Sequence, residues 1–408
     1  MKPGLQRIAA LLDLLANPQD GYPIVHVAGT NGKTSTVRMA ANLLSGHGLT
    51  PGILTSPHLH RVEERFEHGL QTMTPGQFAS AMSELAPIVD LCEERSGDGI
   101  TYFELTVALA HAWFAERSID AAVIETGLGG RLDATNSAAS EVSVITTIGL
   151  EHTAFLGETV AEIAVEKLAI LDEGALLVTG DLHPDAELVA AKAATERGAT
   201  WFSSGRDFDV TDQRSVDGGW SFDMRSVYEE YTDIELRLRG RHQVRNFSTA
   251  VAAVEALFGR ALDEAGVREA AATVTTPGRM EVLRSDPLLM LDGAHNPEAM
   301  GALAAALREE LPGISWEMVF GTMADKDGSA MLEPFRELVT SVHAVAVDNP
   351  RARPAAETAS VVESALDIPV DIHDSIDAAV EAAISSGNPV LVTGSLYLVG
   401  EVRAALSG

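Results

Sequence analysis

The chain has 408 residues, enough for two or three domains of ordinary size. It contains 59 acidic and 29 basic residues, so its formal net charge is −30. Nucleic acids and anionic membranes repel an acidic surface, which argues against both as partners. The single cysteine, Cys92, excludes a disulfide framework and favours a reducing compartment. No apolar run approaches the ~18 residues of a membrane span, so the sequence predicts a soluble, cytoplasmic protein.

Short apolar runs alternate with longer amphipathic stretches along the first half of the chain. Strands are predicted at 24–28, 52–55, 121–125 and 142–147, and helices at 34–44, 75–92, 103–117 and 160–171. This alternation is typical of βαβ units, in which helices connect parallel strands. We therefore expect an α/β fold built on a parallel sheet.

The pattern changes near residue 200. Short alternating segments at 220–224 and 234–238 are expected to flank the turn signal Asp217-Gly218-Gly219 and to form an antiparallel patch. Helical stretches at 242–258 and 262–274 follow, and the pattern breaks at 275–278. A second alternation then begins, with strands predicted at 288–291, 316–320, 342–347 and 390–393 and a helix at 297–311. We expect a larger domain at 1–275 and a smaller, doubly wound (Rossmann-like) domain at 276–408.

A glycine-rich loop, 29–35 (GTNGKTS), connects the first predicted strand to a helix. In this context, typical of P-loops, backbone N–H groups at the helix N-terminus face a polyphosphate, and Lys33 reaches its outer phosphates. The strict Walker spacing requires a glycine where Val27 stands. The alternative is a glycine turn before an ordinary helix, but the lysine and the following hydroxyl of Thr34 favour a nucleotide site.

Polar residues also follow two later strands of the first domain. Glu125 ends a buried strand and precedes a glycine-rich segment. P-loop ATPases use an acid at such a strand end to hold Mg²⁺. The alternative is that Glu125 is an exposed loop acid. His152 follows the strand at 142–147 and is either a metal ligand or an ordinary loop histidine. Lys167 lies in a helical stretch, and alone it would be interpreted as a solvated helix lysine.

The second domain contains a similar strand end. The strand at 288–291 is followed by Asp292-Gly293, and a helix begins at Pro297. Asp292 is placed to accept hydrogen bonds from ribose hydroxyls, and His295 to meet a phosphate or carboxylate. The alternative is a tight turn without a ligand.

Taken together, the motifs resemble the Mur ligase superfamily, specifically the folylpolyglutamate synthase/dihydrofolate synthase family. The resemblance covers nearly the whole chain and rests on LLANPQ (14–19), GTNGKTS (29–35), TSPHLHRVEER (55–65), TYFE (101–104), ETGLGGRLDATN (125–136), LEHTAFLG (150–157), GRHQVRN (240–246), PGRME (277–281), DGAHNP (292–297) and TGSLYLVG (393–400). GTNGK and HNP occur across the superfamily, whereas SPHL…ER with TYFE and GLGGRLDATN is far more specific.

The resemblance implies a role for each matching residue. ATP would be bound by Asn31, Gly32, Lys33, Thr34, Asn246, Arg279 and Asp292. Magnesium, at two sites, would be held by Ser56, Glu125 and His152, and a monovalent cation is also expected. The pterin would contact Thr101, Tyr102, Phe103, Glu104, Leu132, Asp133 and Ala134. Lys33, Lys167 and His295 would act at the reacting groups, with Lys167 present as a carbamate.

Four departures from the family pattern blur which pteroate or folate form is preferred. Thr34 replaces the glycine that is commonest in the folate branch, and Glu151 stands where Asp is usual. Ala154 stands where some bifunctional members have Asp, and Leu168-Ala169 replaces Ala-Gly.

The resemblance implies an ATP-dependent amide ligase that joins L-glutamate to dihydropteroate or folate (poly)glutamates through an acyl phosphate. A monomer with small-molecule substrates is expected. One alternative is another Mur-type ligase, for peptidoglycan precursors or poly-glutamate. Peptidoglycan ligases have a nucleotide-sugar domain before the P-loop, and only 28 residues precede Gly29 here. The other alternative is a non-catalytic ATP-binding module, which the retention of every proposed phosphate and magnesium residue disfavours.

Overall fold

The computed structural model describes residues 4–406, and its largest sheet has eight strands in the order β4-β3-β2-β5-β1-β6-β7-β8. The strands are β1 Ile24–Ala28, β2 Pro51–Leu54, β3 Phe66–His68, β4 Gln71–Thr72, β5 Ala121–Glu125, β6 Val142–Ile145, β7 Leu176–Thr179 and β8 Thr200–Ser203. The six strands from β2 to β8 in this order are parallel, and β3 and β4 extend the sheet antiparallel. The carboxyl ends of β1, β5 and β6 therefore meet at one edge.

Helices cover both faces of this sheet, which explains why its strands are continuous apolar runs. In β1, Val25 and Val27 belong to the core shared with α2 and α8, while Ile24 faces the core of α1 and α4. The helices and short 3-10 turns (η) of this part are α1 Gln6–Leu14, η1 Pro18–Gly21, α2 Lys33–Gly46, η2 Val62–Arg65, α3 Pro75–Ser96, α4 Tyr102–Glu116, η3 Ala134–Ser137, α5 Thr153–Leu156, α6 Val160–Leu168, α7 Pro184–Glu196, α8 Arg241–Phe258 and α9 Glu264–Thr273. No helix within residues 4–406 is both long and apolar enough to span a bilayer.

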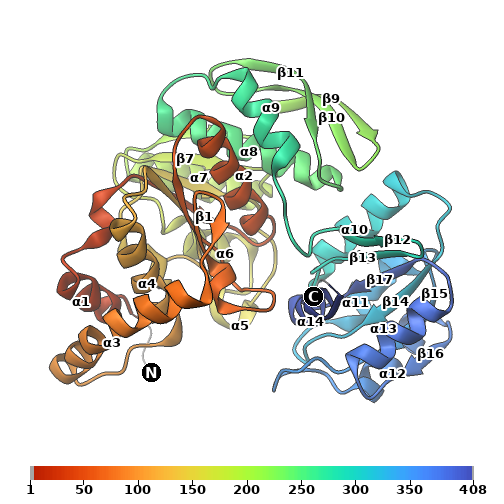
Figure 1. The fold of residues 1–408 in the computed structure, drawn as a ribbon. Helices are drawn as coiled ribbons and strands as arrows, with labels where there is room; N and C mark the ends of the chain where they lie inside the picture. Colours follow the sequence, from red (N-terminus) through yellow and green to blue (C-terminus); the bar gives the residue numbers. More distant parts are fainter. Residues whose placement is uncertain (1–3, 407–408) are drawn as a thin grey trace.

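A three-stranded antiparallel sheet packs against α8. Figure 1 shows this sheet next to α9. Its strands are β9 Asp209–Val216, β10 Gly219–Arg225 and β11 Glu230–Leu236. The expected patch is confirmed, but the order predicted around its turn was wrong. Asp217-Gly218 joins β9 to β10, and both predicted segments follow the turn. The sequence pattern missed β9 because that strand is largely exposed and lacks an apolar face.

The second sheet has six strands in the order β12-β13-β17-β14-β15-β16, parallel except for β12. Its strands are β12 Glu281–Ser285, β13 Leu288–Leu291, β14 Trp316–Phe320, β15 Val339–Ala344, β16 Val370–Ile372 and β17 Val390–Thr393. Its helices and 3-10 turn are α10 Pro297–Glu310, α11 Gly328–Leu332, η4 Glu333–Phe335, α12 Ala355–Leu366, α13 Ile376–Ser385 and α14 Leu396–Leu406. Figure 1 shows this sheet as a separate body beside the first, and the expected α/β architecture is confirmed. The division expected at 275/276 falls between α9 and β12.

The end of α10 attaches the second sheet domain to the first. The buried Glu310 carboxylate accepts hydrogen bonds from Trp220 Nε1 at 2.8 Å and from the Gly240 N–H at 2.5 Å. Its other oxygen lies 3.5 Å from the Arg239 guanidinium. Because Gly240 precedes α8, this contact anchors the start of a helix that lines the cavity described below.

Replacing Glu310 with alanine is expected to lower stability, because two buried donors then lose their acceptor. Each unmade bond costs about 1–3 kcal/mol. The matched control is Glu309→Ala, which removes a more exposed ion pair with Arg241 and is expected to cost ~0.5 kcal/mol or less. Thermal unfolding of both variants measures the difference, and equal effects would contradict the assigned role of Glu310.

Candidate active site

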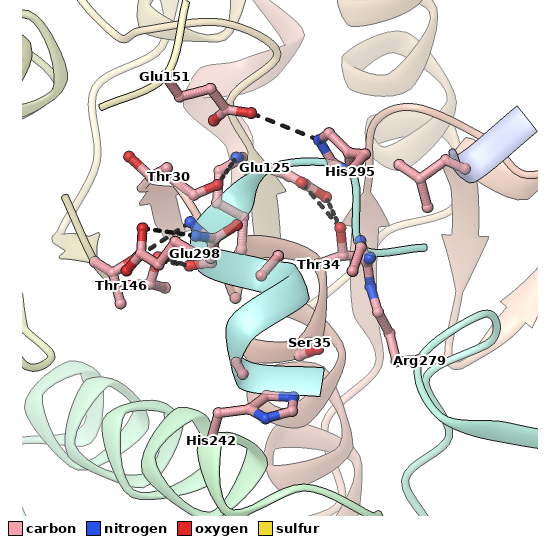
Figure 2. A pocket seen from close by; sticks show the side chains of 18 of the residues that line it. Thr30, Thr34, Ser35, Glu125, Thr146, Glu151, His242, Arg279, His295 and Glu298 are labelled. Carbon is pink, nitrogen blue, oxygen red and sulfur yellow. Dashed lines mark hydrogen bonds and ion pairs between the residues drawn. The ribbon is translucent and has the colours of Figure 1, made fainter. Parts of the chain in front are cut away.

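A cavity of about 450 Å³ lies between the two sheet domains, at the carboxyl edge of β1, β5 and β6. Figure 2 shows side chains from both domains pointing into it. Every residue predicted for ATP, metal or the reacting groups lines this cavity: Asn31, Gly32, Lys33, Thr34, Ser56, Glu125, His152, Lys167, Asn246, Arg279, Asp292 and His295. Residues far apart in the chain therefore meet at the carboxyl ends of the strands, as their positions after the predicted strands indicated.

The glycine loop approaches α8 closely. Gly32 has φ 86°, and a Cβ at this position would lie 2.5 Å from Asn246 Oδ1, so a larger residue would be both strained and obstructed. Lys33, the first residue of α2, donates hydrogen bonds from Nζ to the carbonyl oxygens of Gly29 at 3.0 Å and Thr30 at 3.1 Å. The ammonium thus lies along the loop at a helix N-terminus, as anion binding requires.

Oxygen atoms gather around Glu125 at the end of β5. Thr34 Oγ1 lies 3.0 Å from both carboxylate oxygens of Glu125, and the Ser56 N–H donates to Oε2 at 3.2 Å. Burial raises the pKa of Glu125, and Lys33 opposes that shift. The Glu125 carboxylate and the hydroxyls of Thr34 and Ser56 are hard oxygen ligands, which Mg²⁺ prefers. The remaining coordination positions of the ion would be filled by phosphate oxygens and water. Among residues 4–406, no group of three or more His, Cys, Asp or Glu side chains is arranged to hold a metal, so this candidate depends on the hydroxyls.

A second polar group centres on Glu151, to which the sequence assigned no role. Glu151 Oε1 lies 3.7 Å from His152 Nε2 and 3.5 Å from His295 Nε2, so the carboxylate faces imidazoles from both domains. Figure 2 shows the contact between Glu151 and His295. Burial opposes ionisation of Glu151, yet the contact with His295 and the positive Lys33 hold its pKa well below the usual range. Within the described chain His152 pairs with Glu151 and not with Glu125, so a single ion shared by His152 and Glu125 stays a prediction.

Lys167 is buried near the end of α6, with 3% of its surface exposed. Its Nζ donates a hydrogen bond to the Gly29 carbonyl at 2.7 Å, so it contacts the glycine loop from behind. Burial, together with the positive Lys33, lowers the pKa of Lys167 to about 7. The interpretation of Lys167 as a solvated helix lysine is wrong, because the helix presents it to the site.

The seven residues predicted for the pterin do not line this cavity, but two of them meet over Gly127. A Cβ on Gly127 would lie 2.6 Å from the Phe103 ring and 3.1 Å from Asp133 Oδ2. The Phe103 ring and the Asp133 carboxylate therefore both lie next to Gly127. The neighbours of this glycine, Thr126 and Leu128, line the cavity. Burial raises the pKa of Asp133, and hydrogen bonds from Thr135 oppose the shift.

The other predicted pterin residues have structural roles or exposed side chains. Thr101 and Glu104 form the capping box that begins α4, and Glu104 also pairs with Arg7 at 3.0 Å. Tyr102 is 57% exposed, beneath the Arg65 guanidinium at 5.5 Å from its ring centroid. Leu132 is 40% exposed, and Ala134 is buried in η3. Capping alone accounts for the Thr-x-x-Glu pattern, so its ligand role stays a prediction.

Known proteins match this chain over most of its length. The Mur ligase middle domain matches residues 27–254, and the Mur ligase glutamate ligase domain matches residues 278–396. The chain belongs to the Mur ligase family. A Mycobacterium tuberculosis dihydrofolate synthase/folylpolyglutamate synthase is 36% identical over 367 residues, covering 86% of this chain and 75% of that protein. The resemblance drawn from the motifs is therefore confirmed.

Solved Mur ligase structures match over the whole chain. M. tuberculosis folylpolyglutamate synthase, in complex with ADP and AMPPCP, superposes with a TM-score of 0.95 at 34% identity, covering 100% of this chain and 96% of that one. An FPGS–AMPPCP–folate complex gives a TM-score of 0.87 at 31% identity, covering 99% and 95%. Both domains and their arrangement therefore have solved counterparts.

Two residues of α8 in this Mur ligase, His242 and Arg245, line the cavity without having been predicted. His242 lies in the first turn of α8, and burial, with the positive Arg279 nearby, lowers its pKa to about 4. Arg245 pairs with Asp181 at 2.6 Å across the same wall. His242 and Arg245 belong to the GRHQVRN motif, from which only Asn246 was selected, so the signal was present in the sequence.

Asn31 links the glycine loop to the second domain. Its side-chain amide donates to Glu298 Oε2 at 3.0 Å, and its oxygen accepts from Asn296 Nδ2 at 3.1 Å. Both partners lie at the start of α10, whose far end is anchored by Glu310. Both ends of α10 are therefore attached to the first domain, and the first half of the helix lines the cavity.

Proposed function

We propose that this Mur ligase uses ATP to join L-glutamate to a pteroate or folate carboxylate, giving ADP, phosphate and the glutamyl amide. The observation that carries the proposal is the cavity shared by two domains. The glycine loop and Glu125 lie on one side, and Asp292 and His295 lie on the other. The names of the relatives and the ATP analogue in the matched complexes support the same reaction.

The first step would activate the carboxylate, which is a poor electrophile. Transfer of the γ-phosphoryl group gives an acyl phosphate, whose phosphate is a good leaving group. Lys33 lies where its ammonium can exchange the loop carbonyls for phosphate oxygens and offset their charge. Mg²⁺, held by Thr34, Ser56 and Glu125, would neutralise further phosphate charge when bound.

The second step would form the amide. The glutamate ammonium loses one proton, and the neutral amine attacks the acyl carbon to form a tetrahedral intermediate. A second proton leaves the nitrogen for a base or water, and the intermediate collapses to the amide as the C–O bond to phosphate breaks. Because water would hydrolyse the acyl phosphate, the site must be enclosed. The contacts of Asn31 with α10, and of Glu151 with His295, connect the two domains across the cavity, and further closure on substrate binding would exclude water.

The pterin ring would lie against Phe103, with its amino group and ring N–H donating to Asp133. Asp133→Ala is expected to raise the pteroate KM by about ten- to a hundredfold, because a hydrogen bond to a charged group contributes ~1.5–3 kcal/mol. The ATP KM is expected to change little, since the glycine loop is untouched. Steady-state kinetics with each substrate varied in turn measure both, and equal changes would count against this assignment.

A substrate panel tests the reaction itself. Dihydropteroate and reduced folates are each supplied with ATP, Mg²⁺ and glutamate, and phosphate release is followed with and without glutamate. The proposal expects release only when pteroate or folate and glutamate are both present. ATP binding without release would favour the non-catalytic module, and release with other carboxylates alone would favour another Mur-type ligase. The cytoplasm is the proposed location, and light scattering tests the proposed monomer.

A further inference from the structure

A chain of buried hydrogen bonds leads from the central strand β1 to Asp133. His26 Nε2 lies 2.8 Å from Thr135 Oγ1, and Thr135 Oγ1 lies 2.6 Å from Asp133 Oδ1. His26 and Thr135 are each 1% exposed, and Asp133 is 6% exposed. Neither His26 nor Thr135 lines the cavity, so neither is used by the reaction as derived above.

The chemistry of the three groups sets the direction of these bonds. An ionised carboxylate only accepts hydrogen bonds, so the Thr135 hydroxyl must donate its hydrogen to Asp133. The hydroxyl then offers only lone pairs to His26, which must donate from Nε2–H. Burial lowers the pKa of His26 to about 3, so its ring is neutral and has a single N–H to place. Both hydrogens thus point toward Asp133.

The same bonds make the two carboxylate oxygens of Asp133 different. Oδ1 accepts from the Thr135 hydroxyl and from the Thr135 N–H at 3.1 Å, so its lone pairs are occupied inside the protein. Oδ2 accepts from the Leu128 N–H at 2.7 Å and faces the Phe103 ring above Gly127. One oxygen therefore fixes the carboxylate plane, and the other is presented beside the aromatic wall.

We propose that His26 is a positioning residue that acts through Thr135 to orient Asp133, so that Oδ2 receives the hydrogen bonds of the pterin ring. This inference rests on the proposed function, because it requires a pterin at Asp133. It also gives β1 two tasks. Its carboxyl end leads into the glycine loop, and its middle supports the carboxylate that recognises the other substrate.

Matched substitutions test this role by kinetics. Thr135→Val and His26→Phe fill the same space without a hydrogen-bonding group, whereas Thr135→Ser and His26→Gln keep a donor. The first pair is expected to raise the pteroate KM about tenfold while the ATP KM stays within about twofold. The second pair is expected to recover most of the loss. Thr358→Val, which removes a buried hydroxyl without a partner on α12, is the control for a buried Thr→Val change.

The outcomes separate this inference from the function on which it rests. If Asp133→Ala raises the pteroate KM but Thr135→Val and His26→Phe do not, the relay is overturned and the pterin assignment stands. If all three variants leave the pteroate KM unchanged, the relay and the pterin assignment are both overturned. Should the valine and phenylalanine variants unfold, nitrogen-15 NMR of histidine-labelled wild-type protein decides. A neutral His26 protonated at Nε2 supports the relay, whereas protonation at Nδ1 or at both nitrogens overturns it.

Discussion

Lys33→Ala is expected to lower kcat by at least about a hundred- to a thousandfold, the range seen when one preorganised charge-stabilising group is removed. Within residues 4–406 the Lys33 ammonium donates hydrogen bonds to the loop carbonyls of Gly29 and Thr30, and it forms no ion pair. Removing it should therefore leave the fold intact while the transferring phosphoryl group loses one of the cations that offset its charge. Phosphate release measures the rate, and circular dichroism and thermal unfolding confirm the fold.

The matched control for this charge removal is Lys192→Ala. Lys192 is exposed on α7 and pairs with Glu196 one turn away, so its loss should change neither rate nor fold. A Lys33→Ala enzyme with near-normal turnover would show that the loop does not bind the phosphates in the way we infer.

Lys167→Ala is expected to abolish activity, with partial rescue by formate or acetate. The neutral amine of Lys167 can add CO₂ to form a carbamate, releasing one proton and placing a negative oxygen ligand near His152. A pKa of about 7 makes much of the amine neutral at physiological pH, which carbamylation requires. The alternative, a bare amine that only packs behind the loop, predicts no rescue by small carboxylates.

The contribution of Lys167 to folding stability is expected to depend on pH. The pKa of Lys167 falls from 10.5 to about 7 on folding, so the unfolded chain binds more protons between those values. Stability from this group therefore rises with pH across that window, and carbamylation is favoured in the same direction. A carbon-13 NMR carbamate signal in labelled bicarbonate, lost in Lys167→Ala, measures the modification. A fully active alanine variant without such a signal would refute it.

Elements with local signals were predictable from sequence. β5, β13, β14 and β17 have the predicted bounds, because each is a short apolar run buried on both faces. The glycine loop and the strand-end acids were found because each follows a predicted strand, and the carboxyl ends of parallel strands lie at one edge of the sheet. By contrast, none of the residues of β9 is fully buried, so the strand shows no apolar period.

The remaining parts of the site depend on tertiary contacts. Glu151 becomes notable only when the second domain brings His295 within 3.5 Å. Lys167 looks exposed in a helical pattern, yet the packing of α6 behind the glycine loop buries it. Thr101 and Glu104, which the resemblance assigns to the pterin, form a capping box, so their place in the fold is explained by helix geometry and their ligand role stays a prediction.

The bond between Trp220 and Glu310 also gives the protein an intrinsic optical reporter. The chain has four tryptophans, and the indole N–H of Trp220 bonds across the junction of the two domains. Trp201 bonds Thr179 within the large sheet, while the indole nitrogens of Trp113 and Trp316 are buried without partners. Separation of the domains would expose Trp220 to water and shift its fluorescence to longer wavelength. With the other three tryptophans replaced by phenylalanine, that shift would follow opening and closing during turnover in real time.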